Sequence, residues 1–387
     1  MTARFAGDPV QLLSQLIACA SVTPVEAGAL GVLEAALTPL GFAVTRLRFE
    51  GDGSYPVDNL FATRGTGGKR LLFAGHTDVV PPGDLADWTS DPFLPRIADG
   101  KIYGRGAADM KSGIAAFVAA VMAIPAGAGT VALAITNDEE ADAINGTEKL
   151  MAWARTNGHE FDFAIVGEPS SAARLGDSIK VGRRGSFSGR ITVTGVQGHV
   201  AYPEKANNPL PVLARVVAAL SGEPIDTRTE LFPPSNLEFT SIDVGNPTGN
   251  VIPAKGEARF NIRYNDRWSP ETLRDWVEAQ IAKVDAGGCT IGFELAARPS
   301  RSFLSPRGEA IDLLDQVLTE ITGQRPLLST GGGTSDARFI AQYCPVVECG
   351  LVGTTLHKSD EHVLLSDVTG LSALYAAFMR RYFAVTP

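Results

Sequence analysis

The chain has 387 residues, of which 44% are hydrophobic and 20% are charged, and it carries a net charge of −9. Because this length exceeds what a single hydrophobic core usually serves, two domains are expected. The acidic balance argues against nucleic acid or an anionic membrane as the main partner, since both attract basic surfaces. A small anionic substrate is compatible with this charge, because it needs only a local basic patch.

The first predicted element is an amphipathic helix over residues 9–20. Its apolar residues recur at helical spacing and polar residues interrupt them, which favours a helix over the apolar core of a signal peptide. The sequence has no apolar run of about 18 residues, so no membrane-spanning segment is expected. Four cysteines without CxxC spacing fit a reducing compartment, and we expect a cytoplasmic location.

Helices and strands then alternate up to about residue 181. Helices are expected over residues 28–40 and Ile114–Ile124, and buried strands over Arg70–Gly75, Val131–Thr136 and Phe163–Gly167. This alternation predicts an α/β fold with a mostly parallel sheet that is sandwiched by helices.

The pattern changes between residues 182 and 296. The expected strands are Phe187–Thr194, Leu237–Val244, Gly256–Tyr264 and Thr290–Ala296, and the expected helices are Asn208–Leu220 and Pro270–Val284. Their order along the chain is strand, helix, strand, strand, helix, strand. This is the order of a ferredoxin-like α+β unit.

Helix–strand alternation returns over Ala310–Thr322, Val346–Gly350 and Asp367–Phe383. We therefore expect a discontinuous domain made of residues 1–181 and 297–387, into which a second domain of residues 182–296 is inserted.

Acidic and histidine side chains follow the ends of several predicted strands. His76, Glu140 and Glu168 each follow a buried strand, and His357 lies in the loop after another, while Asp109 precedes a helix. Ligands of open α/β sheets bind beyond the carboxyl ends of the strands, so we expect these side chains to meet. Imidazole and carboxylate groups suit zinc or a related ion. Five such ligands are too many for one catalytic zinc and fit two ions that share a carboxylate.

Each of these residues also has a purely structural interpretation. Asp109 fits the N-cap of the following helix, and Glu168 before a proline fits a turn. However, several strand ends supply side chains of the kind that bind metals. A purely structural role for all of them at once is therefore a weak explanation. His362 lies close enough in sequence to His357 to compete with it as a ligand, and its role stays open.

Two further stretches carry recognisable motifs. They are Gly75-His76-Thr77-Asp78-Val79-Val80-Pro81-Pro82-Gly83 and Gly104-Arg105-Gly106-Ala107-Ala108-Asp109-Met110-Lys111-Ser112-Gly113. The chain resembles, over essentially its whole length, the zinc aminoacylase and carboxypeptidase family of metal-dependent amide hydrolases. The resemblance implies a zinc-peptidase-like catalytic domain with an inserted domain that dimerises and acts as a lid.

The resemblance also assigns the metal ligands. It implies two zinc ions per subunit, for which cobalt can substitute, with Asp109 bridging both. His76 and Glu168 complete one site, and Glu140 and His357 complete the other. A non-proline cis peptide is implied after the bridging residue.

Three residues have implied catalytic roles. Asp78 orients a ligand histidine, a role that fixes its tautomer. Glu139 is the general base, and His199 reaches the active site of the partner subunit in a homodimer and stabilises the oxyanion.

A second set of motifs is similar to one branch of this family. These are Gly182-Arg183-Arg184-Gly185-Ser186, Gly195-Val196-Gln197-Gly198-His199-Val200-Ala201-Tyr202-Pro203, Asn250-Val251-Ile252-Pro253, Gly332-Gly333-Thr334-Ser335-Asp336 and His357-Lys358-Ser359-Asp360-Glu361. Members of that branch cleave N-succinyl-L,L-2,6-diaminopimelate to succinate and L,L-2,6-diaminopimelate in bacterial lysine and cell-wall synthesis. The expected substrate contacts are Arg183, Ser186, Tyr202, Asn250, Arg263, Gly333 and Thr334, with Arg184 as a further candidate.

Two other functions stay open. The first is hydrolysis of acetylornithine or another N-acyl amino acid by the same chemistry. The second is a non-catalytic zinc-binding scaffold on the same fold. Glu139 beside Glu140 argues against a scaffold, because a structural metal site needs no additional base.

Overall fold

The structure is a computed structural model that describes residues 7–222 and 224–385. It divides into two compact units. The large unit contains the chain up to Val181, Ser305–Ser329 and the chain from Ser335 onwards, and the small unit contains Gly182–Leu304 and Thr330–Thr334. The division expected from the sequence, with one domain of residues 1–181 and 297–387 and an inserted domain of residues 182–296, stays a prediction.

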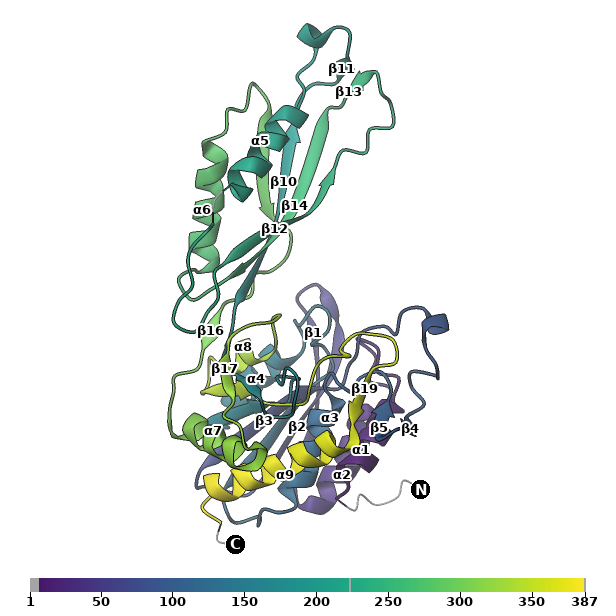
Figure 1. Cartoon of the computed structure of the whole chain (residues 1–387), viewed down its shortest axis with the longest axis vertical. Helices are drawn as coiled ribbons and strands as arrows, with labels where there is room; N and C mark the ends of the chain where they lie inside the picture. The colour runs from purple at the N-terminus through teal and green to yellow at the C-terminus, as the bar shows by residue number, and fades with distance from the viewer. Residues whose placement is uncertain (1–6, 223, 386–387) are drawn as a thin grey trace. The chain divides into compact units, whose positions relative to one another are not determined.

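An eight-stranded sheet forms the centre of the large unit (Figure 1). Its strands, in spatial order, are β1 (Ala43–Gly51), β2 (Ser54–Arg64), β6 (Thr130–Thr136), β3 (Arg70–His76), β7 (Phe163–Val166), β18 (Val346–Glu348), β8 (Ser178–Lys180) and β17 (Leu327–Ser329). The four adjacent strands β6, β3, β7 and β18 are mutually parallel. The predicted α/β sheet is therefore confirmed, whereas the antiparallel strands β1 and β2 were not predicted.

The central strands are buried along nearly their whole length. This explains their continuous apolar sequences, because a parallel sheet covered on both faces has no polar side. Strand β3 pairs in register with β6 up to its last residue, so that His76 lies opposite Thr136. The two strands consequently end at the same edge of the sheet.

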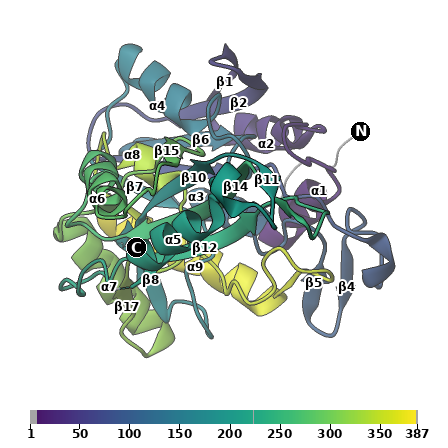
Figure 2. The same cartoon turned by 90° about the horizontal axis from the view of Figure 1, so that it is seen from above.

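Helices cover both faces of this sheet, and Figure 2 shows α4 and α9 on opposite sides of it. Helix α3 packs against α1 and α9, and α9 also packs against α7, while α4 packs against α8. The bounds are α1 (Pro9–Ile17), α2 (Ala29–Leu37), α3 (Lys111–Val121), α4 (Thr147–Thr156), α7 (Glu309–Thr322), α8 (Ala337–Ile340) and α9 (Leu365–Tyr382). The first helix ends before the predicted residue 20, and the second continues as a 3-10 turn over Thr38–Leu40.

A separate small sheet lies at one edge of the large unit, as the labels β4 and β5 show in Figures 1 and 2. It consists of β4 (Arg96–Ala98), β5 (Lys101–Tyr103) and β19 (His362–Leu364), in the order β19-β5-β4. Each strand has three residues, which is too short for a two-residue hydrophobic period to be visible in the sequence.

The small unit has the predicted ferredoxin-like order. Its elements are β10 (Gly185–Thr194), α5 (Leu210–Ser221), β12 (Asn236–Asp243), β14 (Lys255–Tyr264), α6 (Pro270–Ala282) and β15 (Thr290–Leu295), and the sheet order is β12-β14-β10-β15. Strand β10 alternates buried and half-buried residues, because one face packs on the core under α5 and α6. Two short pairs complete the unit: β11 (Gly198–His199) with β13 (Val251–Ile252), and β9 (Gly182–Arg183) with β16 (Phe303–Leu304).

Within the residues that the structure describes, no helix has both the length and the apolar character needed to cross a membrane.

Candidate metal centre and active site

The predicted ligands of the large unit meet at the carboxyl ends of its central strands. His76 is the last residue of β3, and Glu140 lies in the loop after β6. Glu168 follows β7, and Asp109 lies just before α3. His357 lies in the loop between β18 and β19. Segments far apart in the sequence are therefore brought to one edge of the sheet.

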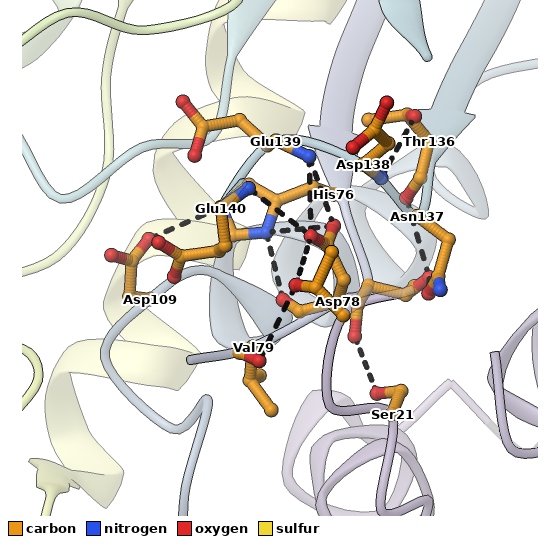
Figure 3. A network of polar contacts seen from close by, with 12 residues as sticks. Ser21, His76, Asp78, Val79, Asp109, Thr136, Asn137, Asp138, Glu139 and Glu140 are labelled. Atoms are coloured by element: carbon orange, nitrogen blue, oxygen red, sulfur yellow. Dashed lines mark hydrogen bonds and ion pairs between the residues drawn. The ribbon is translucent and has the colours of Figure 1, made fainter. Parts of the chain in front are cut away.

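The two carboxylate oxygens of Asp109 face two different imidazoles. Asp109 Oδ1 lies 3.2 Å from His76 Nε2, and Asp109 Oδ2 lies 3.1 Å from His357 Nε2. Glu168 Oε1 is 3.4 Å from His76 Nε2, and Glu140 Oε1 is 3.1 Å from His357 Nε2. The result is two clusters of one imidazole and two carboxylates that share Asp109. Figure 3 shows His76, Asp109 and Glu140 converging beside Asp78.

The hydrogen bonds around His76 indicate that this cluster fits a cation. His76 Nδ1 lies 2.9 Å from the backbone oxygen of Asp78, which can only accept, so we assign the ring proton to Nδ1. The lone pair of Nε2 then points at the carboxylate oxygens of Asp109 and Glu168, an arrangement that needs a second proton or a metal ion between them. Nitrogen and oxygen donors of this kind suit divalent first-row metals.

The side chains of the two clusters shift the pKa values of one another. Hydrogen bonds with Asp109 and Glu140 raise the pKa of His357 to about 10. Burial, reinforced by the charge of Asp109, raises the pKa of Glu168 to about 8. Burial alone would raise the pKa of Asp109, but hydrogen bonds with His357 and His76 outweigh it and lower that pKa. Asp109 is thus the carboxylate that stays ionised between two imidazoles.

The Asp78 side chain contacts residues of both clusters. Its carboxylate is fully buried, and Oδ2 accepts hydrogen bonds from the backbone N–H groups of Glu139 and Glu140, each at 3.1 Å. Oδ2 also accepts from the hydroxyl of Thr23 at 2.7 Å, and Oδ1 lies 3.6 Å from His76 Nδ1. One side chain therefore contacts His76 and the backbone of the next ligand loop.

Glu139 and Glu140 have different surroundings. A carboxylate oxygen of Glu139 lies within 4.8 Å of ligand atoms of His76 and Glu168. Removal from water raises the pKa of the Glu139 carboxyl well above its usual value, although the charge of His76 opposes this shift. A raised pKa makes a carboxyl group a better proton acceptor, as a general base requires.

His362 lies apart from both clusters. It pairs with Tyr103 across β19 and β5, and the two ring centroids are 4.8 Å apart. Its Nδ1 lies 2.8 Å from the backbone oxygen of Asp360. The ambiguity between these two histidines is thereby reduced, because His357 contacts the Asp109 carboxylate and the described contacts of the His362 ring are with Tyr103 and Asp360.

The remaining candidate residues belong to the small unit. His199 is exposed, and its Nδ1 accepts a hydrogen bond from the backbone N–H of Ala201 at 3.0 Å. Its Nε2 must then carry the ring proton, so the outer nitrogen is a donor. Tyr202 lies beside it, with 5.7 Å between the ring centroids, and Asn250 directly precedes β13.

Two arginines of the small unit, Arg184 and Arg263, lie close enough for their charges to interact. Burial lowers the pKa of Arg184, and the neighbouring charge of Arg263 lowers it further. Arg184 Nε and Arg263 Nη1 are buried and have no hydrogen-bond partner among the described residues. Arg263 pairs with Ser186 across β14 and β10. This pair of half-buried cations is suited to a carboxylate ligand.

Arg183 instead holds the glycine-rich loop. Its Nη1 donates to the backbone oxygens of Gly331 at 3.3 Å and Gly333 at 3.2 Å. A Cβ atom at Gly332, whose φ is 102°, would lie 2.4 Å from this nitrogen. The loop that carries Gly333 and Thr334 therefore requires glycine at this position.

Sequence reasoning missed the groups that support the ligands. Thr23 is 55 residues from Asp78, which it contacts, and no local pattern marks such a pair. Arg105 and Glu361 stood in the quoted motifs, but no role was assigned to them. The structure joins them through a buried ion pair of 2.6 Å.

Together, the fold and the two imidazole–carboxylate clusters that share Asp109 form a candidate centre for two neighbouring metal ions. The sequence profile of Peptidase family M20/M25/M40 matches residues 72–381. The chain belongs to this family. It is a metal-dependent amidohydrolase by that membership.

Curated relatives that carry one enzyme name are similar over nearly the full length. A succinyl-diaminopimelate desuccinylase of Rhodopseudomonas palustris is 50% identical, with 98% of this chain and 99% of the relative covered. An enzyme of the same name from Methylorubrum populi is 50% identical, with 97% and 99% covered.

Solved structures confirm the fold. The aminopeptidase PepT of Bacillus cereus matches with a TM-score of 0.76 at 21% identity, covering 96% of this chain and 97% of its own. The YXEP protein of Bacillus subtilis, described as a dinuclear metal-binding peptidase, matches with a TM-score of 0.68 at 14% identity, covering 98% of both chains.

Proposed function

We propose that this chain hydrolyses the amide bond of N-succinyl-L,L-2,6-diaminopimelate and releases succinate and L,L-2,6-diaminopimelate. The observation that supports metal-dependent hydrolysis is the position of Asp109, whose carboxylate is shared between two imidazole–carboxylate clusters. The substrate is supported by relatives about 50% identical that bear the desuccinylase name.

The proposed metal is zinc, two ions per subunit, and cobalt would substitute because it accepts similar ligands. His76 and Glu168 would hold one ion, Glu140 and His357 the other, and Asp109 both. Bound divalent ions polarise a carbonyl group and lower the pKa of bound water.

Glu139 is the proposed general base. It takes a proton from the attacking water and returns it to the nitrogen of the leaving amine, so that one carboxylate serves as base and then as acid. Asp78 fixes the orientation of His76 and the backbone of Glu139 through the contacts described above. His199 donates from Nε2 to the oxyanion that develops on the amide oxygen.

The carboxylates of the substrate would bind in the small unit. Arg263, with Arg184 beside it, supplies the positive charge. This is supported by one buried nitrogen of each side chain, Arg184 Nε and Arg263 Nη1, that has no hydrogen-bond partner among the described residues. Arg183 holds the glycine-rich loop in place. The neutral contacts are proposed to come from Ser186, Tyr202, Asn250, Gly333 and Thr334.

The proposed assembly is a cytoplasmic homodimer that forms through the small unit, which also acts as a lid. In this arrangement His199 enters the active site of the partner subunit. The exposure of His199 supports this role, since its donor nitrogen is available to another chain.

The test is desuccinylation by metal-free protein to which zinc is added back stepwise. We expect no turnover without zinc and full turnover with two equivalents. N-acetylornithine, assayed in parallel, should react far more slowly. Faster hydrolysis of N-acetylornithine would replace the proposed substrate, and zinc binding without hydrolysis of any acyl amino acid would favour a scaffold.

A further inference from the structure

Glu361 is a fully buried carboxylate that follows His357 in the same loop. Its Oε1 accepts hydrogen bonds from the backbone N–H groups of Ala108 at 2.7 Å and Asp109 at 3.1 Å. Its Oε2 accepts from the backbone N–H of Gly106 at 3.1 Å and from Arg105 Nη1 at 2.6 Å. All four donors come from the short segment that ends at Asp109.

These bonds join two ligand-bearing segments that are distant in the sequence. Glu361 and Asp109 are 252 residues apart, and the bond between them connects the loop of His357 directly to the backbone of the shared carboxylate. The backbone oxygen of Glu361 also accepts from the N–H of Gly104 at 2.9 Å. The His357 loop is thus attached along the whole turn that presents Asp109.

Hydrogen bonds between Thr355 and His362 also join the two ends of the segment that contains His357 and Glu361. The hydroxyl of Thr355 donates to the backbone oxygen of His362 at 2.8 Å and accepts from its N–H at 3.2 Å. Arg105, which is 2% exposed, also donates to the backbone oxygen of Lys358 at 3.3 Å. Glu361 is the acidic partner that keeps this buried guanidinium neutralised, and charge-assisted bonds of this kind are stronger than neutral ones.

The other metal position is anchored differently. His76 is the last residue of β3, which is hydrogen-bonded on both sides to β6 and β7. Glu168 follows β7 directly and therefore also depends on the central sheet. None of the hydrogen bonds of the Glu361 carboxylate described above involves His76 or Glu168, so Glu361 reaches that position only through the shared Asp109.

We propose that Glu361 is a positioning residue that sets the affinity of the metal position formed by Glu140, His357 and Asp109. It affects the position of His76 and Glu168 much less, because it contacts that position only through the shared Asp109 and not through a second ligand loop. This inference rests on the proposed two-zinc function. Changes in residues that hold metal ligands in place typically weaken metal binding by about 10- to 100-fold.

The test is a zinc titration of metal-free protein against a competing chelator, which yields two dissociation constants. Glu361→Gln keeps the size of the side chain but removes its charge and turns an N–H₂ group towards the donors. We expect one constant to rise by about 10- to 100-fold and the other to change by less than about 3-fold. Glu309→Gln is the matched control, because Glu309 is exposed on α7, and should change neither.

Two further variants separate positioning from a general loss of structure. Glu361→Asp keeps the negative charge on a shorter side chain, so it should restore part of the zinc affinity that the Gln variant loses. If the Gln variant does not fold, the zinc titration is made with Glu361→Asp. In a His357→Ala background one zinc is already lost, so Glu361→Gln should change the remaining constant by less than about 3-fold.

The two hypotheses fail in distinguishable ways. Wild-type protein that does not bind two zinc ions would overturn the proposed function itself. Wild-type protein that binds two ions, with a Glu361→Gln variant that binds both as tightly or loses both equally, would overturn only the role of Glu361.

Discussion

Glu139 and Glu140 are neighbours in the chain, but their side chains face different partners. Glu140 contacts His357 at 3.1 Å, whereas Glu139 lies beside His76 and Glu168. The family resemblance implied different roles for them, with Glu139 as the general base and Glu140 as a metal ligand.

We expect Glu139→Gln to retain both metal ions and to lower kcat by about 10²- to 10⁴-fold, the usual contribution of a general base. Metal analysis of the purified variant and a desuccinylation assay measure the two effects. Glu140→Gln is the control, which should lose one metal ion as well as activity. Near-normal turnover by Glu139→Gln would remove Glu139 as the base.

The raised pKa values of the metal-free site predict how zinc binding responds to pH. At pH 7 His357, with a pKa of about 10, and Glu168, with a pKa of about 8, both hold a proton. Zinc needs both groups deprotonated, so binding releases protons and its affinity rises with pH up to these values. Calorimetry in buffers of different ionisation enthalpy should show net proton release at pH 7 and a smaller release above pH 8. A release that does not change with pH would contradict these pKa shifts.

Elements differ in how well the sequence predicts them, and burial explains the difference. The central strands β3, β6 and β7 are apolar throughout because both of their faces are covered. Strand β1 is half-buried or exposed at every position, so it has no apolar period to reveal it. The site follows the same rule. Ligands at strand ends were predictable, whereas Thr23 meets Asp78 and Glu361 meets Asp109 only through the tertiary fold.

The hairpin formed by β1 and β2 supports the loop of Glu139 and Glu140. The hydroxyl of Tyr55 on β2 donates to Asp138 Oδ1 at 2.6 Å. The buried carboxylate of Asp138 also accepts from the backbone N–H groups of Ala143, Ile144 and Asn145 at 3.0–3.2 Å. The loop after β6 is therefore folded around Asp138 and held against the hairpin.

Tyr55→Phe removes the bond to Asp138, together with a weaker 3.2 Å bond that the hydroxyl accepts from the backbone N–H of Asp142, without changing the shape of the ring. We expect the free energy of unfolding to fall by about 1.5–3 kcal/mol, as for a hydrogen bond to a charged group. Urea denaturation of the metal-free protein measures this change. Ser54→Ala removes an exposed bond to Asp142 from the same hairpin and should cost no more than about 0.5 kcal/mol. Equal effects of the two variants would show that the Asp138 contact has no special role.

At the scale of the whole molecule, the proposed dimer makes two chains responsible for each active site. If His199 acts in the partner subunit, a mixed dimer of Glu139→Gln and His199→Ala chains contains one intact site, because the second chain keeps its Glu139 and receives His199 from the first. The other site of that dimer lacks both groups. If His199 acts within its own chain, both sites are defective.

We therefore expect two nearly inactive variants to regain activity when they are unfolded together and refolded, or coexpressed. The mixed dimer should reach about half of the wild-type kcat, because one of its two sites is complete. Differently tagged chains allow the mixed dimer to be isolated, and each variant refolded alone is the control. If the mixed dimer is as inactive as the two parent variants, His199 acts in its own subunit. The proposal that each active site needs a residue of the second chain would then be wrong.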